Sequence, residues 1–294
     1  METLLYITWD VDPVAFSLGS LSVRWYGIFW AIGIYLCWLV QVHLYKKDMA
    51  PEDWADKIFT YMVIGVIVGA RIGHCWFYEW HEAANLGLEP LKILGLTFNY
   101  RNPYIEHPFM LLKIWEGGLS SHGGAIGLIT AAIILNKKHF HTGVPWILDR
   151  LVIGIAITAT LIRLGNLFNS EIYGGPTTLP WGFIFVRDGQ TVPCHPTQIY
   201  EMIYCIVAGV VSYWMYSRTK AKQRPGLILG VWLLIVFVTR FVLEFIKFDQ
   251  EAFEANFVLN MGQVLSIPLI LWAAWLIWHA LSHDPVPLDY AKRK

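Results

Sequence analysis

The chain has 294 residues, of which 56% are hydrophobic and only 15% are charged, and its formal net charge at pH 7 is +0. Its mean hydropathy of +0.47 lies above the range of soluble domains and indicates a polytopic membrane protein. No basic surface rich enough for nucleic acid is present, so a nucleic-acid partner is excluded. Residues 1–20 lack a basic n-region and contain Asp10, Asp12 and Pro13, so we expect no cleavable signal peptide before the first span.

Seven apolar stretches are long enough to cross a bilayer, because about 20 apolar residues in a helix span the hydrocarbon core. We predict membrane helices at residues 21–45, 57–80, 118–136, 144–169, 197–217, 225–246 and 261–282. The expected fold is therefore an all-α integral membrane protein, a bundle of seven transmembrane helices that forms a single polytopic domain over residues 1–294.

Lysine and arginine are distributed unevenly between alternate loops, and basic loops stay on the cytoplasmic side of a membrane. One set of loops, with the C-terminal tail, holds a dense group of cations: Lys46, Lys47, Lys57, Lys137, Lys138, Arg218, Lys220, Lys222, Arg224, Lys292, Arg293 and Lys294. The other loops hold fewer: Lys92, Arg101, Lys113, Arg187 and Lys247. We therefore predict an N-terminus outside, a C-terminus in the cytoplasm, and a cap formed by the outward loops 81–117 and 170–196.

Polar residues within the predicted spans gather at their outer ends. They are Tyr26, Arg71, His74, Glu79, His122, Arg163, Asn166, Asn169, Glu171, His195, Gln198, Glu201, Arg240, Glu244, Asn260 and Gln263. A charged side chain at bilayer depth costs about 2.5–3.5 kcal/mol on insertion scales, so such residues usually mark a substrate or ion site. We expect the inner halves of the helices to be nearly free of charge.

Helical spacing places several of these side chains on shared faces. Arg163 and Asn166 stand at i and i+3, and Arg240 and Glu244 at i and i+4, so each pair can point into one cavity. Small residues at Gly65, Gly69 and Gly73, and at Gly123, Gly124 and Gly127, fit the small-xxx-small pattern of close helix contacts. We therefore expect a tight bundle around a polar pocket.

The chemistry of this pocket favours an anionic lipid headgroup. Arginine holds phosphate with a rigid fork of donors and stays ionised, so Arg163 and Arg240 suit both phosphate binding and stabilisation of a phosphate leaving group. Histidine accepts a proton near neutral pH, so His122 is a candidate base that generates a thiolate or alkoxide nucleophile. The residues predict phospholipid chemistry without a cofactor.

Structural roles compete with these functional ones. Arg71 and Glu79 lie near a helix end, where a charged side chain can extend to the interface. Glu201 and Glu244 would neutralise buried arginines without taking part in chemistry, and His122, beside two glycines, would serve as a hydrogen-bonded structural histidine.

Two other kinds of site have weaker support in the sequence. His74, His122 and His195 show no diagnostic metal-ligand spacing, so we predict no metal. Cys194 next to His195 resembles a nucleophile beside a base, but no third group is evident.

Several motifs occur in the order typical of one family: Arg24-Trp-Tyr26-Gly27, His122-Gly-Gly-Ala-Ile-Gly127, Arg163-Leu-Gly-Asn166 through Gly174, His195-Pro-Thr-Gln-Ile-Tyr-Glu201, Arg240-x-x-x-Glu244 and Met261-Gly-Gln-Val-Leu-Ser-Ile-Pro268. Over essentially its whole length the chain resembles the prolipoprotein diacylglyceryl transferases. The resemblance implies transfer of the diacylglyceryl group of phosphatidylglycerol to the thiol of the lipobox cysteine in a bacterial preprolipoprotein signal peptide. A thioether forms and glycerol phosphate leaves. It also implies the bacterial inner membrane, with membrane lipids as surroundings, a periplasmic cap and an active site towards the outer leaflet.

The same resemblance implies roles for individual residues. The expected catalytic residues are His122, Arg163, Arg240, Glu171 and Tyr26. The expected substrate-binding residues are Arg163, Asn166, Gly174, Arg240, Glu244, His195, Glu201 and Arg71. Arg163 and Arg240 would hold the phosphate, and His122 would assist deprotonation of the thiol.

The chain departs from the usual family pattern at three positions. Ile162 and Ser170 stand where glycine is common, and Tyr173 stands where tryptophan is common. These changes are conservative, so we expect function to be kept. The outward segment 81–117 is long, which predicts a cap of different shape.

Other functional classes compete with the transferase. An intramembrane protease would need a Gly-x-Ser-x-Gly elbow or a pair of aspartates within spans, and neither appears. A transporter or a lipid-binding scaffold would use the same outer pocket without chemistry, although no inverted repeat or pair of broken helices is visible.

Overall fold

The computed structural model describes residues 6–19, 21–93, 96–113, 118, 120–247 and 259–286. The chain forms two compact units: the first unit comprises Met1–Glu52 and Pro145–Lys294, and the second comprises Asp53–Val144.

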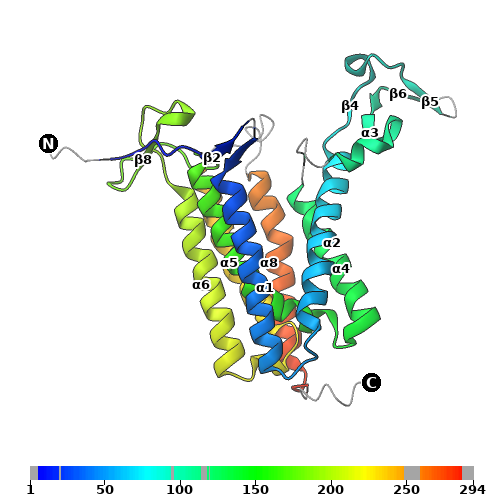
Figure 1. Ribbon diagram of the computed structural model, residues 1–294, viewed down its shortest axis with the longest axis vertical. Helices are drawn as coiled ribbons and strands as arrows, with labels where there is room; N and C mark the ends of the chain where they lie inside the picture. The colour runs from blue at the N-terminus through cyan, green and yellow to red at the C-terminus, as the bar shows by residue number, and fades with distance from the viewer. Residues whose placement is uncertain are drawn as a thin grey trace. The chain divides into compact units, whose positions relative to one another are not determined.

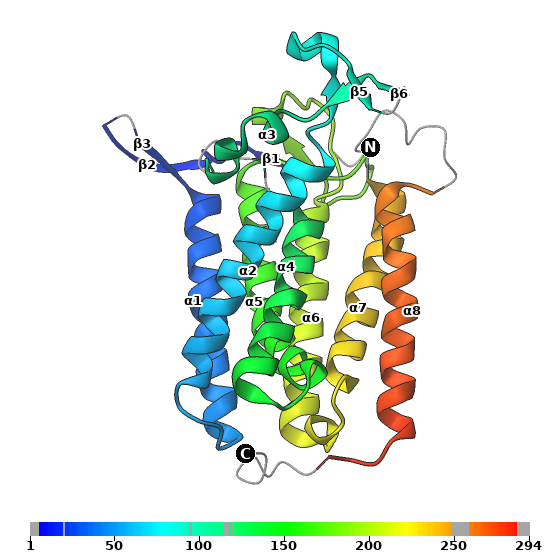
Figure 2. The ribbon, with the colours of Figure 1, turned by 90° about the vertical axis from the view of Figure 1, so that its right-hand side faces the viewer.

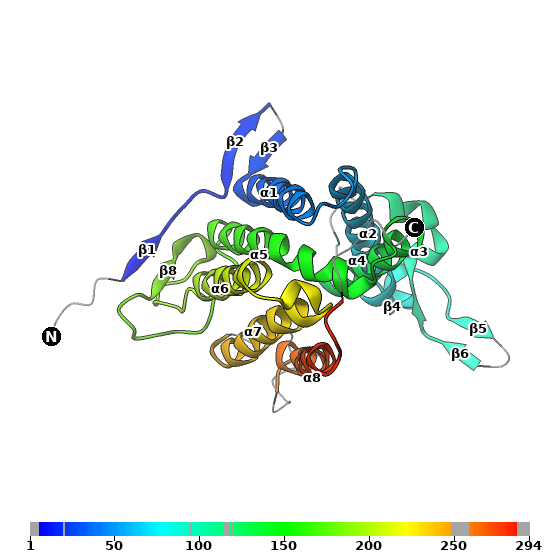
Figure 3. The same ribbon diagram turned by 90° about the horizontal axis from the view of Figure 1, so that it is seen from below.

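The first unit is a bundle of long helices, seen lengthwise in Figure 1 and end-on in Figure 3. Its helices are α1 (Trp25–Lys47), α5 (Val144–Phe168), α6 (Thr197–Arg218), α7 (Leu227–Leu243) and α8 (Met261–Ser282). Helix α7 packs against both α6 and α8, and Figure 2 shows α7 and α8 side by side. A 3-10 turn, η7 (Glu244–Ile246), continues α7, and two others, η5 (Val186–Asp188) and η6 (Ala221–Gln223), lie in loops.

Short strands flank these helices, and the sequence did not predict them. A parallel pair joins β1 (Ile7–Trp9) to β8 (Phe183–Phe185). An antiparallel hairpin joins β2 (Val14–Leu18) to β3 (Leu21–Arg24) and runs directly into α1. Trp9 of β1 donates from Nε1 to the Leu167 carbonyl at 2.9 Å, which ties the N-terminal strand to the end of α5.

The second unit is built on two helices, α2 (Trp54–Phe77) and α4 (Ser121–Leu135), and α4 continues as a π-helical turn, η4 (Asn136–Phe140). The segment between them carries small elements: β4 (His81–Glu82), η1 (Ala83–Leu86), β5 (Leu91–Ile93), β6 (Leu96–Phe98), β7 (Tyr100–Arg101), α3 (Pro103–Glu106) and η2 (Pro108–Leu112). Strand β4 pairs with β7, and β5 pairs with β6.

Within the described residues, six helices are long and apolar enough to cross a membrane, which confirms an integral membrane protein of helical type. They correspond to all the predicted spans except 118–136. The chain is helical there too, but α4 has only 15 residues before the π-helical turn. A seventh crossing therefore stays a prediction.

Glycine allows α2 and α4 to approach at backbone distance, as the small-residue pattern predicted. A methyl group at Gly69 would lie 2.4 Å from the Gly123 carbonyl oxygen, and one at Gly127 would lie 2.0 Å from the Gly65 carbonyl oxygen. No side chain fits at such distances, so glycine at these positions sets the separation of the two helices.

The first unit carries buried charge at the end where α1 finishes and α5 begins, here called the Asp48 end. The expectation of inner halves nearly free of charge is wrong here, because the side chains of Asp48 and Arg150 are both 0% exposed. Arg150 donates from Nε and pairs through Nη2 with one Asp48 oxygen at 2.9 and 2.8 Å, and Tyr216 donates to the other oxygen at 2.7 Å. The cation also lies 3.8 Å from the Trp146 ring centroid. Pairing therefore makes these charges tolerable in an apolar bundle.

A neighbouring carboxylate, Asp149, joins α5 to α7 at the same end. It accepts from the backbone N–H groups of Gly226 at 2.8 Å and Leu229 at 2.7 Å. These groups lie at the start of α7, where amides have no partner within the helix. Asp149 therefore serves as a cap supplied from another helix.

We predict that Gly127→Ala destabilises the protein. The new methyl group would collide with the Gly65 carbonyl, and overpacking of this kind costs about 1–3 kcal/mol. Thermal unfolding in detergent, followed by tryptophan fluorescence, should show a lower midpoint. Gly27→Ala is the matched control, since no described atom lies within 4 Å of its added methyl. An unchanged midpoint for Gly127→Ala would contradict the packing argument.

We predict that Arg150→Met costs about 3–5 kcal/mol, because it leaves Asp48 buried without its main partner. Unfolding of the same detergent-solubilised protein measures this effect. The double variant Asp48→Asn with Arg150→Met should recover part of the loss, since it removes both fully buried charges and leaves only the partly exposed Lys222 without its Asp48 partner. A double variant as unstable as the single one would refute the charge-pair account.

Candidate functional site

The opposite end of the first unit, here called the Arg163 end, gathers polar side chains from the end of α5, the start of α6, the end of α7 and the start of α8. At its centre, an arginine, a glutamate, a lysine, a second glutamate and a second arginine form a continuous series of ion pairs. We name it the charge chain, and its members are Arg163, Glu201, Lys247, Glu244 and Arg240.

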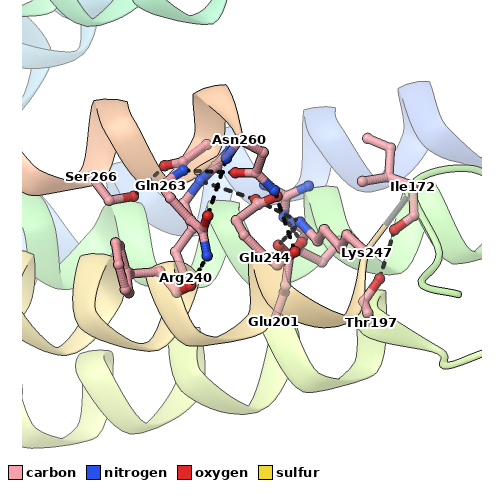
Figure 4. A network of polar contacts seen from close by, with 12 residues as sticks. Ile172, Thr197, Glu201, Arg240, Glu244, Lys247, Asn260, Gln263 and Ser266 are labelled. Carbon is pink, nitrogen blue, oxygen red and sulfur yellow. Dashed lines mark hydrogen bonds and ion pairs between the residues drawn. The ribbon is translucent and has the colours of Figure 1, made fainter. Parts of the chain in front are cut away.

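Four contacts connect the charge chain, and Figure 4 shows Glu201 of α6 close to Arg240, Glu244 and Lys247 at the end of α7. Arg163 Nε lies 2.7 Å from Glu201 Oε2, while Lys247 Nζ lies 2.8 Å from Glu201 Oε1. Lys247 Nζ also lies 3.2 Å from Glu244 Oε1, and Arg240 Nε lies 3.6 Å from the same oxygen. The lysine is therefore the link between the two glutamates.

Residues at the start of α8 hold Glu244 in place. Asn260 donates from Nδ2 to the Glu244 carbonyl oxygen and to Oε2, at 3.3 and 3.4 Å. Asn260 is itself fixed by a capping box with Gln263. A side chain at Gly262 would lie 2.6 Å from the Glu244 carboxyl carbon, so glycine leaves room for the carboxylate.

The segment after α5 turns back and returns Glu171 to the helix end. Arg163 Nη1 donates to Asn166 Oδ1 at 3.3 Å, and Asn166 Nδ2 donates to Glu171 Oε1 at 2.7 Å. Asn169 Nδ2 adds a second donor to that oxygen at 3.2 Å. Glu171 is thus held as a hydrogen-bond acceptor close to Arg163, at one end of the charge chain.

This return requires unusual backbone geometry. Ser170 and Ile172 both have positive φ, +55° and +59°, in a region that favours glycine. That geometry explains why glycine suits position 170 in the resemblance noted above. Thr197 Oγ1 donates to the Ile172 carbonyl at 2.8 Å, and Gln198 Nε2 donates to the Glu171 carbonyl at 2.7 Å. Contacts from α6 therefore hold the strained segment.

Gly174 and His195 meet through the backbone, where the Gly174 N–H donates to the His195 carbonyl at 2.8 Å. Gly174 also forms a bridge with Lys247, and a side chain there would lie 2.6 Å from the Ile246 carbonyl oxygen. The loop after α5, the start of α6 and the end of η7 are joined at this point. His195 Nδ1 lies 3.3 Å from the Tyr200 hydroxyl.

Tyr26, near the start of α1, packs on α5 at Gly165. A methyl group at Gly165 would lie 2.7 Å from Tyr26 Cδ2, so glycine allows the ring to approach. Gly165 is less than one helical turn away from both Arg163 and Asn166 on α5. The Tyr26 ring therefore packs on the turn of α5 that carries these two residues.

Two predicted site residues belong to the second unit. Arg71 is 4% exposed and donates to the carbonyls of Leu111, Gly118 and Met110 at 3.1, 3.2 and 2.9 Å. It thus holds the segment between α3 and α4. His122 is exposed in the first turn of α4, which Ser120 caps by accepting from the Gly123 N–H at 3.2 Å.

The cysteine beside His195 lacks the properties of a nucleophile. Cys194 is 0% exposed, and burial raises the pKa of its thiol, which disfavours the thiolate. Among the described residues, no three His, Cys, Asp or Glu side chains gather in a group that could hold a metal ion. His74 instead pairs with Glu79 at 2.8 Å.

The structure thus brings together most of the predicted site residues, all from the first unit: Tyr26, Arg163, Asn166, Glu171, Gly174, His195, Glu201, Arg240 and Glu244. Lys247 was missed, because the predicted span ended at residue 246 and the lysine was assigned to a loop. Its spacing from Glu244, i to i+3, was the available signal.

Comparisons with known proteins give one family. Residues 13–279 match the family model described as prolipoprotein diacylglyceryl transferase. The chain is 39% identical to the phosphatidylglycerol–prolipoprotein diacylglyceryl transferase of Porphyromonas gingivalis, over 95% of this chain and 96% of the relative. It is also 39% identical to the protein of the same name from Chloroherpeton thalassium, over 96% and 97%. A third such relative, from Tolumonas auensis, is 38% identical over 90% and 93%.

We predict that His195 titrates below the ordinary histidine value of about 6.5, because burial lowers its pKa by disfavouring the imidazolium. The unfolded chain then takes up a proton that the folded protein does not, so folding stability falls as the pH drops below about 6.5. NMR of ¹⁵N-histidine-labelled protein measures the pKa, with His195→Gln identifying the resonance. A pKa at or above 6.5 would contradict this prediction.

Proposed function

Because this chain belongs to the prolipoprotein diacylglyceryl transferase family, we propose that it transfers the diacylglyceryl group of phosphatidylglycerol to the lipobox cysteine of bacterial preprolipoproteins. It is a transferase of lipoprotein biosynthesis and carries out the first step of lipoprotein maturation. The observation that supports the assignment best is the charge chain, which ends in an arginine on either side.

The reaction forms one bond and breaks one. The cysteine sulfur, as thiolate, attacks the glycerol carbon that carries the phosphate of phosphatidylglycerol. A C–S bond forms as the C–O bond to phosphate breaks, and the electron pair leaves with glycerol phosphate. The thiol proton passes to a base. Negative charge therefore grows on the phosphate oxygens, and catalysis needs fixed positive charge there.

Arg163 and Arg240 are suited to that task. Each is anchored on one side by a buried glutamate, and their side chains are 21% and 31% exposed. Within the described part of the chain, nitrogens of both guanidinium groups remain without a hydrogen bond. A guanidinium that is always charged and held by a partner can receive a phosphate without reorganising. We assign the phosphate to these two arginines.

The other residues of the Arg163 end shape the site. Asn166 and Glu171 form a hydrogen-bonded pair beside Arg163. Tyr26 of α1 packs on Gly165 of α5, within one helical turn of Arg163. We assign catalytic support to Glu171 and Tyr26. Substrate contacts are assigned to Asn166, Gly174, His195, Glu201 and Glu244.

The two residues of the second unit enter the proposal on their motifs. His122, an exposed imidazole at the start of α4, is assigned to accept the thiol proton. Arg71, whose guanidinium holds backbone carbonyls, is assigned to substrate binding through the segment that it organises.

The membrane arrangement is part of the same proposal. We assign a single polytopic domain of seven spans in the bacterial inner membrane, with the N-terminus outside and the C-terminus in the cytoplasm. The loops 81–117 and 170–196 would form a periplasmic cap, and the Arg163 end would face the outer leaflet. The basic residues of the Asp48 end, among them Lys47 and Lys222, support that orientation.

A lipid-binding or transport protein is the alternative, because it would use the same arginines without chemistry. The two functions differ in product formation. A binder would retain phosphatidylglycerol and yield no modified cysteine, whereas a transferase yields a thioether on the acceptor peptide.

We predict that Arg163→Lys and Arg240→Lys each lower turnover about 100-fold or more, because an ammonium cannot replace a fixed guanidinium fork and loss of one such donor costs about 10²–10³ in rate. Purified protein is incubated in detergent with phosphatidylglycerol and a lipobox peptide, and mass spectrometry follows the diacylglyceryl adduct. Arg218→Gln is the matched control: this exposed arginine ends α6 at the Asp48 end, and its change should leave turnover unaffected.

Adduct formation by the wild-type protein, lost in both site variants and kept in Arg218→Gln, would support the transferase and its site. Bound phosphatidylglycerol without any wild-type adduct would favour the lipid-binding alternative.

A further inference from the structure

His195, just before α6, is held through its backbone by the two glycines of the loop after α5. Its N–H donates to the Gly175 carbonyl at 3.0 Å, and its own carbonyl accepts from the Gly174 N–H at 2.8 Å. Gly174 also forms a backbone bridge with Lys247, a member of the charge chain. The backbone that carries the imidazole is therefore tied, through Gly174, to the charge chain.

Tyr200, in the first turn of α6, and Trp181, in the loop before it, contact the imidazole side of His195. His195 Nδ1 lies 3.3 Å from the Tyr200 hydroxyl, and Trp181 Nε1 donates to the same hydroxyl at 2.8 Å. The rings of His195 and Tyr200 meet edge to face, with their centroids 6.1 Å apart. The three side chains thus form a line that runs from indole through phenol to imidazole.

The direction of the two hydrogen bonds follows from what each group can donate. An indole N–H is a donor only, so the Tyr200 oxygen accepts from Trp181. The phenol proton then has one acceptor among the described residues, His195 Nδ1. Neutral imidazole is the side-chain base that titrates nearest neutral pH, so its nitrogen is a better acceptor than a phenol oxygen. The bond from Trp181 also polarises the phenol and makes it a stronger donor. The hydroxyl proton therefore points to Nδ1.

This direction decides which nitrogen of His195 carries the proton. A neutral imidazole that accepts at Nδ1 is protonated at Nε2. Burial lowers the pKa of His195, so the neutral form prevails at pH 7. The side chain is only half-buried, and Nε2 has no hydrogen-bond partner in the part of the chain that the structure describes. The ring thus presents an unused N–H and not a lone pair.

We propose that Tyr200 is a positioning residue that holds His195 as the Nε2–H tautomer, so that His195 contacts the headgroup phosphate of the lipid as a hydrogen-bond donor and not as a base. This inference rests on the proposed function, which assigns His195 to substrate contacts, and it specifies the nature of that contact. Negative charge grows on the phosphate oxygens during the reaction, so a fixed donor stabilises the transition state there. The thiol proton passes to another group.

The tautomer is measured directly by NMR of the full-length ¹⁵N-histidine-labelled protein in detergent, at about pH 8, where neutral imidazole dominates. A ring nitrogen that carries a proton and one that does not have well-separated ¹⁵N shifts. We expect His195 to show a protonated Nε2 and an unprotonated Nδ1. Tyr200→Phe should give a mixture of both tautomers. Tyr35→Phe is the matched control, since this exposed tyrosine of α1 makes no hydrogen bond among the described residues, and it should leave the shifts unchanged.

Kinetics with phosphatidylglycerol and a lipobox peptide test the donor role. Glutamine can offer an amide N–H in place of Nε2–H but cannot take up a proton, and leucine can do neither. We predict that His195→Leu lowers kcat/KM by about 20–100-fold, as expected for loss of a hydrogen bond to a charged group, and that His195→Gln stays at least about fivefold above His195→Leu. Tyr200→Phe should lower kcat/KM by about 2–10-fold, because one positioning hydrogen bond is lost, whereas Tyr35→Phe should keep the wild-type value.

The proposal is overturned if His195 of the wild-type protein carries its proton at Nδ1, if folded Tyr200→Phe keeps the wild-type ¹⁵N shifts, or if folded His195→Gln is no better than folded His195→Leu. A purely structural tyrosine would change the thermal midpoint but not the tautomer. If Tyr200→Phe does not fold, the wild-type shifts and the two His195 variants decide. Failure of the transferase function is distinguishable: the wild-type protein would then form no adduct, while the ¹⁵N shifts would still report the tautomer.

Discussion

A charge that enters the apolar part of this bundle must be neutralised where it lies, and both ends of the first unit are organised by that constraint. At the Asp48 end Asp48 and Arg150 pair with both side chains fully buried, and an aromatic ring lies beside the cation. At the Arg163 end Glu201, Lys247 and Glu244 pair in the buried centre of the charge chain, and the arginines at its two ends are partly exposed. The first arrangement suits a permanent structural tie, and the second suits an anion that comes and goes.

The two ends also share a method of construction. In each case a side chain from one helix satisfies the exposed amides or charges at the end of another, as Asp149 does for α7 and Asn260 does for Glu244. The loop after α5 follows the same logic, because Thr197 and Gln198 hold carbonyls of a segment whose backbone is strained at Ile172. Helix ends, rather than helix faces, therefore carry the functional groups of this unit.

Packing in the second unit depends on a different property, the absence of side chains. Glycines bring the α2 and α4 backbones so close that a single methyl group at Gly127 has no room. That close pairing fixes the first turn of α4, which presents His122, and Arg71 organises the adjoining segment through its carbonyl contacts. A closely packed pair of helices is a suitable support for the residue that we propose as the acceptor of the thiol proton.

The sequence by itself determined that the protein lies in a membrane, which residues pack α2 on α4, and which polar residues gather around Arg163, because hydropathy and helical spacing are local properties. Family motifs added the reaction. Only the tertiary structure decided which charged side chains pair with each other. Ion pairs such as Asp48 with Arg150 join residues far apart in sequence, and no periodicity connects them. It also turned Lys247 from an apparent loop cation into the centre of the charge chain, because the start of α6 and the end of α7 had to meet before its partners were known.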